Sequence, residues 1–453
     1  VCKRGAFEEY YPWEQGYPPL AFSTLAISKL VAEGIVEKDD IRHGLKKAVK
    51  QLENRFEYQA GNQQVAGLAA LVSIKKIDPT LVNEGKYLSL KKNTLQLQNS
   101  EGWFTEYDGP DLGYLSVTLD CLWDLYDLSG DKDYLHSAEK AFDFVYEFIC
   151  RRNEGAGMHN ARNTDYIVPY GICRFLDTKD LSRRNKSIYL INAVYTNSDN
   201  KVHFFHAIDD RYWSHYIGHS VVRAQLVLDT LKIKPETEFK PDLTTNHSYP
   251  NAGYIFKQLN KENYRILVSS KKGGIFSIYK GDETLASDYG WIVDTGKKQL
   301  VNHWWSEKWE YREAENSIVI QGKLFPHSEK TSTPFLHFGL RMSSFIFGRS
   351  LTRFLRNVLI FKSKASEYEF KRIIDLGSEN VIVTDEIKGR SAPYGTTRAP
   401  RASKRHVASA DSWHHEDFYP VTQTGCSEKI KLSKDIITIE TIFPLKKLGI
   451  RSN

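Results

Sequence analysis

The feature that most constrains this chain is an apolar helical pattern that recurs through its first half. Five stretches begin with turn or polar residues and continue into apolar runs with small side chains. They start at residues 17, 61, 113, 165 and 218, which places them 44 to 53 residues apart. A step this regular indicates a repeat architecture in which each unit is one supersecondary element. More polar segments with helical spacing of their apolar residues lie between them, at 39–56 and 131–149.

Helices that are apolar all round, alternating with amphipathic ones, predict inner helices ringed by outer helices. The first half is therefore expected to form an α/α toroid, an incomplete barrel of helical hairpins. All inner helices of such a toroid point the same way, so their first residues gather on one rim. Helix N-termini carry unpaired N–H groups and a positive dipole end, which favours an anionic ligand there. The side chains expected on this rim are those of Asn62, Gln63, Tyr114, Tyr166 and His219.

In the second half of the chain, the apolar residues follow a different spacing. From about residue 254, short runs with a period of two are separated by Gly, Asp, Asn and Ser turns, which predicts an antiparallel β-sandwich. The expected domains are a toroid at 1–235, a polar linker at 236–253 and a sandwich at 254–453. The fold class is thus α+β with two domains. One stretch, 337–355, fits either a strand or a short helix.

Composition and charge indicate the class of binding partner, but they say little about the reaction. Aromatic residues make up 13% of the chain, which suits stacking on sugar faces, and the formal net charge of +6 favours a polyanion. No nucleic-acid-binding module or basic stripe is present. No apolar run approaches the ~20 residues of a membrane span. The five cysteines form no CxxC pair, and no cofactor or metal is expected, although the i, i+4 spacing of His215 and His219 leaves a divalent metal open.

Several stretches carry a family resemblance that spans nearly the whole chain. They are "GNQQVAGLAAL", "EYDGPDLGYLS", "GGIFSIYKGDETLASDYGWIVDTG" and "RIIDLGSENVIVTDEIKG". The first is similar to an inner helix that bears a functional asparagine, the second to an acidic loop ending in a catalytic tyrosine, and the last two to sandwich strands. The chain resembles the heparinase II/III-like polysaccharide lyases, with alginate lyases and uronyl epimerases as more distant relatives.

The resemblance implies β-elimination at a uronic acid. Asn62, helped by Gln63 or Gln64, would hydrogen-bond the carboxylate and stabilise the enediolate, as an oxyanion hole does. Tyr114 would be the general acid, with the role of base left open. Arg162 would supply positive charge or grip the carboxylate. The remaining substrate-binding candidates are Tyr107 in the acidic loop, Asn163 beside Arg162, Tyr166, His219, and Lys271 ahead of a predicted strand.

The chain departs from the family where a histidine motif usually precedes the first sandwich strand. Here the stretch reads "RILVSSKKGG", so the second proton-transfer residue is not evident. Tyr114 could carry out both transfers, a toroid histidine (His159, His215 or His219) could substitute, or His303 could reach the rim. Loss of catalysis with retention of binding is a further reading.

The leading hypothesis is a polysaccharide lyase that acts on an acidic polysaccharide or oligosaccharide. The alternatives are a uronyl C5-epimerase, a non-catalytic glycan-binding protein of polysaccharide biosynthesis, and a glycoside hydrolase. The hydrolase would need a carboxylate pair drawn from Glu106, Asp108, Asp111, Asp209 and Asp210. A bacterial source is expected, with a periplasmic, secreted or cytoplasmic location all open. The glycan and the oligomeric state stay open, and the start at Val1 suggests a missing N-terminal segment.

Overall fold

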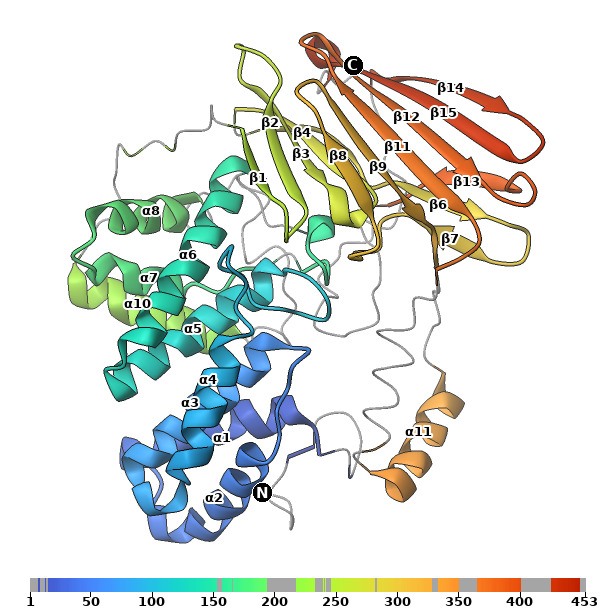
Figure 1. Ribbon diagram of the computed structural model, residues 1–453. Helices are drawn as coiled ribbons and strands as arrows, with labels where there is room; N and C mark the ends of the chain where they lie inside the picture. The colour runs from blue at the N-terminus through green and yellow to red at the C-terminus, as the bar shows by residue number, and fades with distance from the viewer. Residues whose placement is uncertain are drawn as a thin grey trace.

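Helices occupy the first half of the chain and strands most of the second, as Figure 1 shows. The computed structural model describes residues 7–8, 13, 15–152, 157–164, 166–193, 217–232, 239, 241, 246–281, 283–327, 333–348, 350, 365–400 and 425–448. The α-helices in this part are α1 (Tyr17–Ala32), α2 (Lys38–Glu53), α3 (Gly61–Ile77), α4 (Glu84–Leu95), α5 (Leu112–Ser129), α6 (Lys132–Arg152), α7 (Tyr170–Cys173), α8 (Leu181–Ile191), α10 (Gly218–Leu231) and α11 (Pro334–Phe347).

Helices α3 and α5 form the centre of the helical half. Every residue of α3 from Gly61 to Ile74 is buried, because the helix packs against α1 on one side and α5 on another. The burial of α5 is almost as complete, whereas α2 buries a single stripe of apolar side chains. Burying a large aliphatic side chain stabilises a fold by about 1.5–3 kcal/mol, so both helices contribute to the packing energy of the core. They correspond to two of the recurring apolar stretches.

The fourth recurring stretch differs from the expectation. It was expected to begin a helix at Asp165, but α7 begins at Tyr170 and has only four residues before a 3-10 turn at Arg174–Asp177. Pro169 stands at the N-cap, and a proline cannot supply the backbone N–H that an earlier helix start would require. Tyr166 therefore precedes the helix by four residues and does not start it.

The strands form three antiparallel sheets within the described residues. The first has the order β1 (His247–Tyr249), β2 (Tyr254–Gln258), β3 (Tyr264–Ser269), β4 (Ile275–Lys280), β5 (Glu283–Asp288). The second has the order β10 (Phe325–Pro326), β7 (Gln299–Val301), β6 (Trp291–Asp294), β13 (Gly395–Arg398). The third has the order β14 (Ser427–Leu432), β15 (Ile436–Pro444), β12 (Asn380–Lys388), β11 (Glu369–Leu376), β9 (Ser317–Lys323), β8 (Glu310–Glu313). The stretch left open between strand and helix contains α11, which is a helix.

The helical half and the first sheet share one hydrophobic core. Tyr254 of β2 lies against Phe148 of α6, with ring centroids 4.7 Å apart, and Tyr249 lies against Phe144 at 5.1 Å. Part of the expected linker is structured, because His247–Tyr249 pairs with β2 as strand β1. The helices and this sheet therefore meet through packed aromatic side chains.

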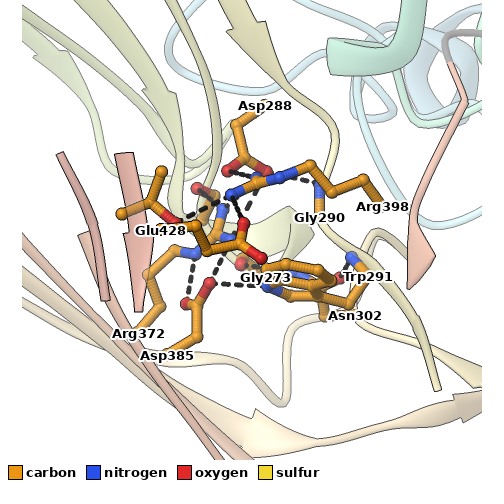
Figure 2. Close-up of polar contacts among 11 residues, drawn as sticks. Gly273, Asp288, Gly290, Trp291, Asn302, Arg372, Asp385, Arg398 and Glu428 are labelled. Atoms are coloured by element: carbon orange, nitrogen blue, oxygen red, sulfur yellow. Dashed lines mark hydrogen bonds and ion pairs between the residues drawn. The ribbon is translucent and has the colours of Figure 1, made fainter. Parts of the chain in front are cut away.

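A buried ion-pair network joins the three sheets (Figure 2). Alternation along the strands turns Arg372 of β11 and Asp385 of β12 inward, where they form two hydrogen bonds of 2.7 Å. Asp288 of β5 accepts from Arg372 at 3.4 Å and from Arg398 of β13 at 2.7 Å. Trp291 of β6 donates its indole N–H to Asp385 at 2.6 Å. Loss of one partner from such a network is costly, because it leaves a buried charge uncompensated. The network therefore holds the three sheets in their relative positions.

None of the helices described here has the length and apolar character needed to cross a membrane.

Candidate functional site

Three chain segments meet at the N-terminal ends of α3 and α5. The first is the first turn of α3, the second is the acidic loop at residues 101–111, and the third comprises residues 157–164 and Tyr166. The first two are tied together by hydrogen bonds at three consecutive residues of α3. Gly61 N–H donates to the Thr105 carbonyl at 2.9 Å, and Asn62 N–H donates to Glu106 Oε1 at 2.7 Å. The Gln63 amide donates to the hydroxyl of Tyr107 at 3.1 Å. The start of α3 thus fixes the acidic loop.

Asp111 joins the acidic loop to the third segment. As the N-cap of α5, its Oδ1 accepts the N–H of Tyr114 at 3.2 Å, and its Oδ2 accepts the N–H of Arg162 at 3.1 Å. The hydroxyl of Thr164 donates to the same carboxylate. Burial raises the pKa of Asp111, and these hydrogen bonds oppose that shift. One capping carboxylate therefore holds the backbones of Tyr114 and Arg162 beside each other.

Arg162 is the least satisfied group in this part of the chain. It is fully buried, and within the described residues none of its three guanidinium nitrogens has a hydrogen-bond partner. Its guanidinium carbon lies 4.5 Å from the centroid of the Tyr107 ring. A buried polar group without a partner costs ~1–3 kcal/mol, and a charged one costs more. A cation held in this way is prepared for an acceptor that the described residues do not provide.

Other polar atoms in the same segments also lack partners among the described residues. They are Asn62 Oδ1, Gln63 Oε1 and Glu106 Oε2, and all three are buried. An amide can present either its oxygen or its NH₂ group after a half-turn, so Asn62 can act as acceptor or donor. These residues add neutral hydrogen-bonding groups beside the Arg162 cation.

Glu106 does not neutralise that cation fully. Burial raises its pKa well above the usual value for a glutamate, the Asn62 N–H lowers it, the neighbouring Asp111 raises it, and Arg162 lowers it. The net effect raises the pKa and so shifts Glu106 toward its protonated form. A protonated Glu106 can donate a hydrogen bond and leaves the charge of Arg162 uncompensated, so the site as a whole is receptive to an anion.

Tyr114 lies in the first turn of α5, where the positive end of the helix dipole is located. Its ring contacts that of Tyr166 edge to face, with centroids 6.3 Å apart. Gly113 allows the helix start to approach the third segment, because a Cβ there would lie 2.4 Å from the Thr164 hydroxyl. The two tyrosines thus come together even though Tyr166 does not start a helix.

A segment from the second half of the chain covers the acidic loop. Trp305 packs on Gly109, where a Cβ would lie 2.4 Å from the indole ring. The sequence left open that His303 reaches the rim, and the contact with Gly109 is made by Trp305. Burial, together with His327 and Lys272, lowers the pKa of His303 well below its usual value. His303 is therefore a buried neutral imidazole two residues from the contact.

Two predicted site residues have their polar groups engaged elsewhere. The ring of His159 bonds Ser269 at 2.6 Å and Ser277 at 3.1 Å, so both nitrogens bridge the helical half to strands β3 and β4. Gln64 Oε1 accepts from Tyr17 and from the Glu57 N–H, at 3.0 and 2.8 Å. In this arrangement His159 is not available for proton transfer, and Gln64 is not available for substrate.

The neighbouring lysines also differ from the expectation. Lys271, expected to bind substrate, pairs with Glu307 at 2.5 Å. Lys272 is buried, and its ammonium group donates to the carbonyls of Met158 and Asn160 and to the side chain of Asn163. Asn163 therefore helps to hold the loop, and Lys272 fixes the loop that carries Arg162.

The start of α10 lies beside Tyr166, because Ile217, Val168 and Tyr166 form a small apolar cluster. His219 is exposed in the first turn of this helix. Its i, i+4 partner His215 lies outside the described residues, as do Asp209 and Asp210. Within the described residues, no group of three or more His, Cys, Asp or Glu side chains is placed to hold a metal ion.

No protein-family model and no curated protein matches the chain. Among solved structures, it is similar to the heparan sulfate lyase HepC from Pedobacter heparinus, with a TM-score of 0.38, 8% identity, and coverage of 96% of this chain and 69% of that one. It is also similar to heparinase III, with a TM-score of 0.45, 10% identity, and coverage of 95% of this chain and 69% of that one. A chondroitin AC lyase mutant of Streptomyces coelicolor A3 is similar with a TM-score of 0.42, 10% identity, and coverage of 96% of this chain and 66% of that one. These structural neighbours are polysaccharide lyases.

Sequence reasoning missed three residues that shape this site. Glu106 was considered only as a hydrolase carboxylate, Trp305 only as part of a stretch around His303, and Lys272 only as a departure from a motif. Burial of Glu106 and Lys272 depends on contacts between segments more than 40 residues apart, for example the 44 residues between Asn62 and Glu106. The small residue Gly109, placed next to two acidic positions, was a signal that another chain segment approaches closely.

Proposed function

We propose that this chain is a polysaccharide lyase that cleaves an acidic, uronic-acid-containing glycan by β-elimination. The observation that carries the proposal is the buried Arg162 guanidinium, which has no hydrogen-bond partner among the described residues. Carboxylates match a guanidinium in charge and in fork geometry, so a uronate is a suitable missing partner.

The first task of the site is to make the C5 proton acidic. A uronate carboxylate bound by Arg162 loses part of its negative charge, and electrons from the C5–H bond can then move into the carboxyl group. Asn62 and Gln63 would hydrogen-bond the enediolate that develops, and a protonated Glu106 would donate to it as well. Preorganised donors of this kind contribute about 2.7–4 kcal/mol of transition-state stabilisation each.

The second task is proton transfer. Tyr114, as phenolate, takes the proton from C5; the C5 electrons form the C4–C5 double bond while the C4–O bond to the leaving sugar breaks. The same phenol then returns its proton to the leaving glycosidic oxygen. The positive end of α5 favours the phenolate that this first transfer requires. Atoms balance, because the products are an unsaturated uronate and a new sugar hydroxyl.

We also infer the finer architecture from the burial pattern. Helices α3 and α5 are buried on all sides and α2 on one stripe, which supports inner and outer helices of an incomplete α/α toroid at residues 1–235. The sheets after the segment 236–253 share a second hydrophobic core, which supports a β-sandwich at 254–453. On this assignment, the toroid carries the site and the sandwich closes over it through Trp305.

One further function is favoured by a specific observation. Glu106 and Asp111 are both buried carboxyls with raised pKa values. A glycoside hydrolase requires a carboxyl pair in which one member, with a raised pKa, acts as the general acid and the other is ionised. Asp111 is fully used as a helix cap, however, so the lyase is the stronger proposal. A C5-epimerase would share the first proton transfer and differ in what happens to the carbanion.

The test is the ultraviolet absorbance of a 4,5-unsaturated uronate during incubation with a panel of uronic-acid polysaccharides. We expect a rise with the wild type and its loss in Tyr114→Phe, while Tyr126→Phe, farther along the same helix, keeps the activity. New reducing ends without this absorbance would contradict the lyase and favour the hydrolase. Activity that persists in Tyr114→Phe would remove Tyr114 from the chemistry.

A further inference from the structure

Helix α11 presents apolar side chains to solvent along its whole length. Phe335 is 89% exposed, Ile346 is 69% exposed and Phe338 is 66% exposed, and other large exposed side chains on the same helix are Leu336, Met342, Phe345 and Phe347. Figure 1 shows α11 set apart from the three sheets. Contiguous apolar surface of this kind marks an interaction site in a soluble protein.

The helix has little support from the rest of the described chain. Ser344 is its only buried residue in this part of the structure, and Phe345 contacts Trp13 edge to face with ring centroids 4.9 Å apart. An isolated helix shorter than about 12–15 residues is marginally stable in water, and α11 has 14 residues. A partner that covers its apolar side chains would therefore stabilise the helix as well as bind it.

The charge around the helix indicates the kind of partner. Between residues 330 and 366 the sequence has seven Lys or Arg residues and no Asp or Glu, and Arg341 lies on α11 itself. A second copy of α11 would bring another Arg341 and no acidic residue to pair with it. The same stretch has no Trp or Tyr, the side chains that suit stacking on sugars, so a glycan fits it poorly as well. An anionic lipid surface offers negative charge and an apolar layer together.

We propose that α11 attaches the protein to the surface of an anionic lipid bilayer. The helix lies in the interfacial plane, with Phe335, Phe338 and Ile346 in the acyl boundary and Arg341 at the headgroups. Trp13, which is 46% exposed beside Phe345, adds an aromatic side chain suited to the membrane interface. Attachment is peripheral and independent of the glycan site, so either proposal can fail alone.

The experiment is flotation of the full chain with two kinds of vesicle, phosphatidylcholine alone and phosphatidylcholine mixed with phosphatidylglycerol. We expect binding to the mixed vesicles, weakened by salt, and little binding to the neutral ones. Because each cation near such a surface contributes ~1 kcal/mol, Arg341→Glu should lower partitioning by about tenfold or more. Removing one inserted aromatic side chain with Phe338→Ser should lower it by about tenfold.

Leu181→Glu is the matched control, because Leu181 is also exposed, at 69%, but lies on α8. It should leave vesicle binding unchanged, and circular dichroism should show that all three variants fold. Equal binding to both kinds of vesicle, or binding that neither α11 variant weakens, would overturn the proposal. A dimer in light scattering that dissociates in Phe338→Ser, without vesicle binding by the wild type, would assign α11 to a second copy and overturn it too.

Discussion

At the scale of single residues, the site contains groups whose environment is unfavourable in the free protein. Arg162 is a buried cation without a hydrogen bond to the described chain, and Glu106 is a carboxyl whose pKa is raised by burial. Each weakens the fold, and each has a role in the proposed binding of a uronate. Proteins retain such unfavourable arrangements where function needs them, which is why perturbed ionisable groups indicate functional sites.

Asp120 offers a residue-scale prediction about pH. It lies buried on α5, accepts the Gly171 N–H at 2.7 Å, and burial raises its pKa to about 6 against the opposing effect of Arg223. The folded state holds this proton to a higher pH than the unfolded state does, so the fold loses stability as the pH rises from about 4 through about 6. Above that range, Asp120→Asn should raise the free energy of unfolding by about 1–3 kcal/mol.

The measurement is urea unfolding of both proteins at a series of pH values. Below the ordinary aspartate pKa of 3.8, the two stabilities should converge, because both side chains are then neutral. A constant offset between the two proteins at every pH would show that Asp120 does not titrate as described.

At the scale of elements, the loop of residues 157–164 positions Arg162 and is held by a buried lysine. The ammonium group of Lys272 donates to Met158, Asn160 and Asn163. Lys272→Met should remove all three hydrogen bonds of this ammonium group and lower the free energy of unfolding by ~1.5–3 kcal/mol or more, since one hydrogen bond to a charged group contributes that much. Lys271→Met removes an ion pair with the exposed Glu307, a hydrogen bond of 3.0 Å to the Asn251 carbonyl and a contact with the Trp305 ring. Interactions of this partly exposed kind are worth about 0–1 kcal/mol each, so a smaller loss is expected. Urea unfolding compares the two, and equal effects would contradict the assignment of Lys272 as the residue that holds the loop.

The same elements show what could be predicted from sequence. The apolar helices α3 and α5 and the strands with a period of two were predictable, because the spacing of apolar residues along the sequence indicates whether all faces or one face of an element is buried. The short helix α7 was not predicted, since a local proline overrode the repeat. Asn62, Gln63, Tyr107, Tyr114, Arg162 and Tyr166 were named from the sequence, and the structure brings them to neighbouring segments, while their roles stay a prediction.

The engagement of His159 and Lys272 could not be predicted in this way. Their partners, Ser269 and Ser277 for His159 and residues 158–163 for Lys272, lie more than 100 positions away in the chain. Long-range hydrogen bonds of this kind depend on how the two halves of the chain pack against each other. The local spacing of apolar residues in the sequence does not predict them. The catalytic role of His159 stays a prediction, and its hydrogen bonds to the two serines speak against it.

At the scale of the whole molecule, the three sheets depend on the network around Arg372 (Figure 2). Arg372→Leu would leave Asp385 buried without its bidentate partner, and Asp288 would keep only Arg398 among its arginine partners. We expect a loss of about 3–5 kcal/mol in the free energy of unfolding. Arg390→Leu is the control, because its pair with Glu367 is largely exposed and should contribute little. A small effect of Arg372→Leu in urea unfolding would show that the sheets associate without the network.

The central claim for the whole molecule is that the buried Arg162 receives the carboxylate of a uronate. The most direct measurement is calorimetric binding of an acidic oligosaccharide, and of the same oligosaccharide with its carboxyl groups reduced to alcohols, to the Tyr114→Phe variant. We predict that the acidic form binds about 10- to 100-fold more tightly, as a charge-assisted hydrogen bond of ~1.5–3 kcal/mol requires. This preference should disappear when Arg162→Met is added. Equal affinity for the two forms, or a preference that survives Arg162→Met, would contradict the account.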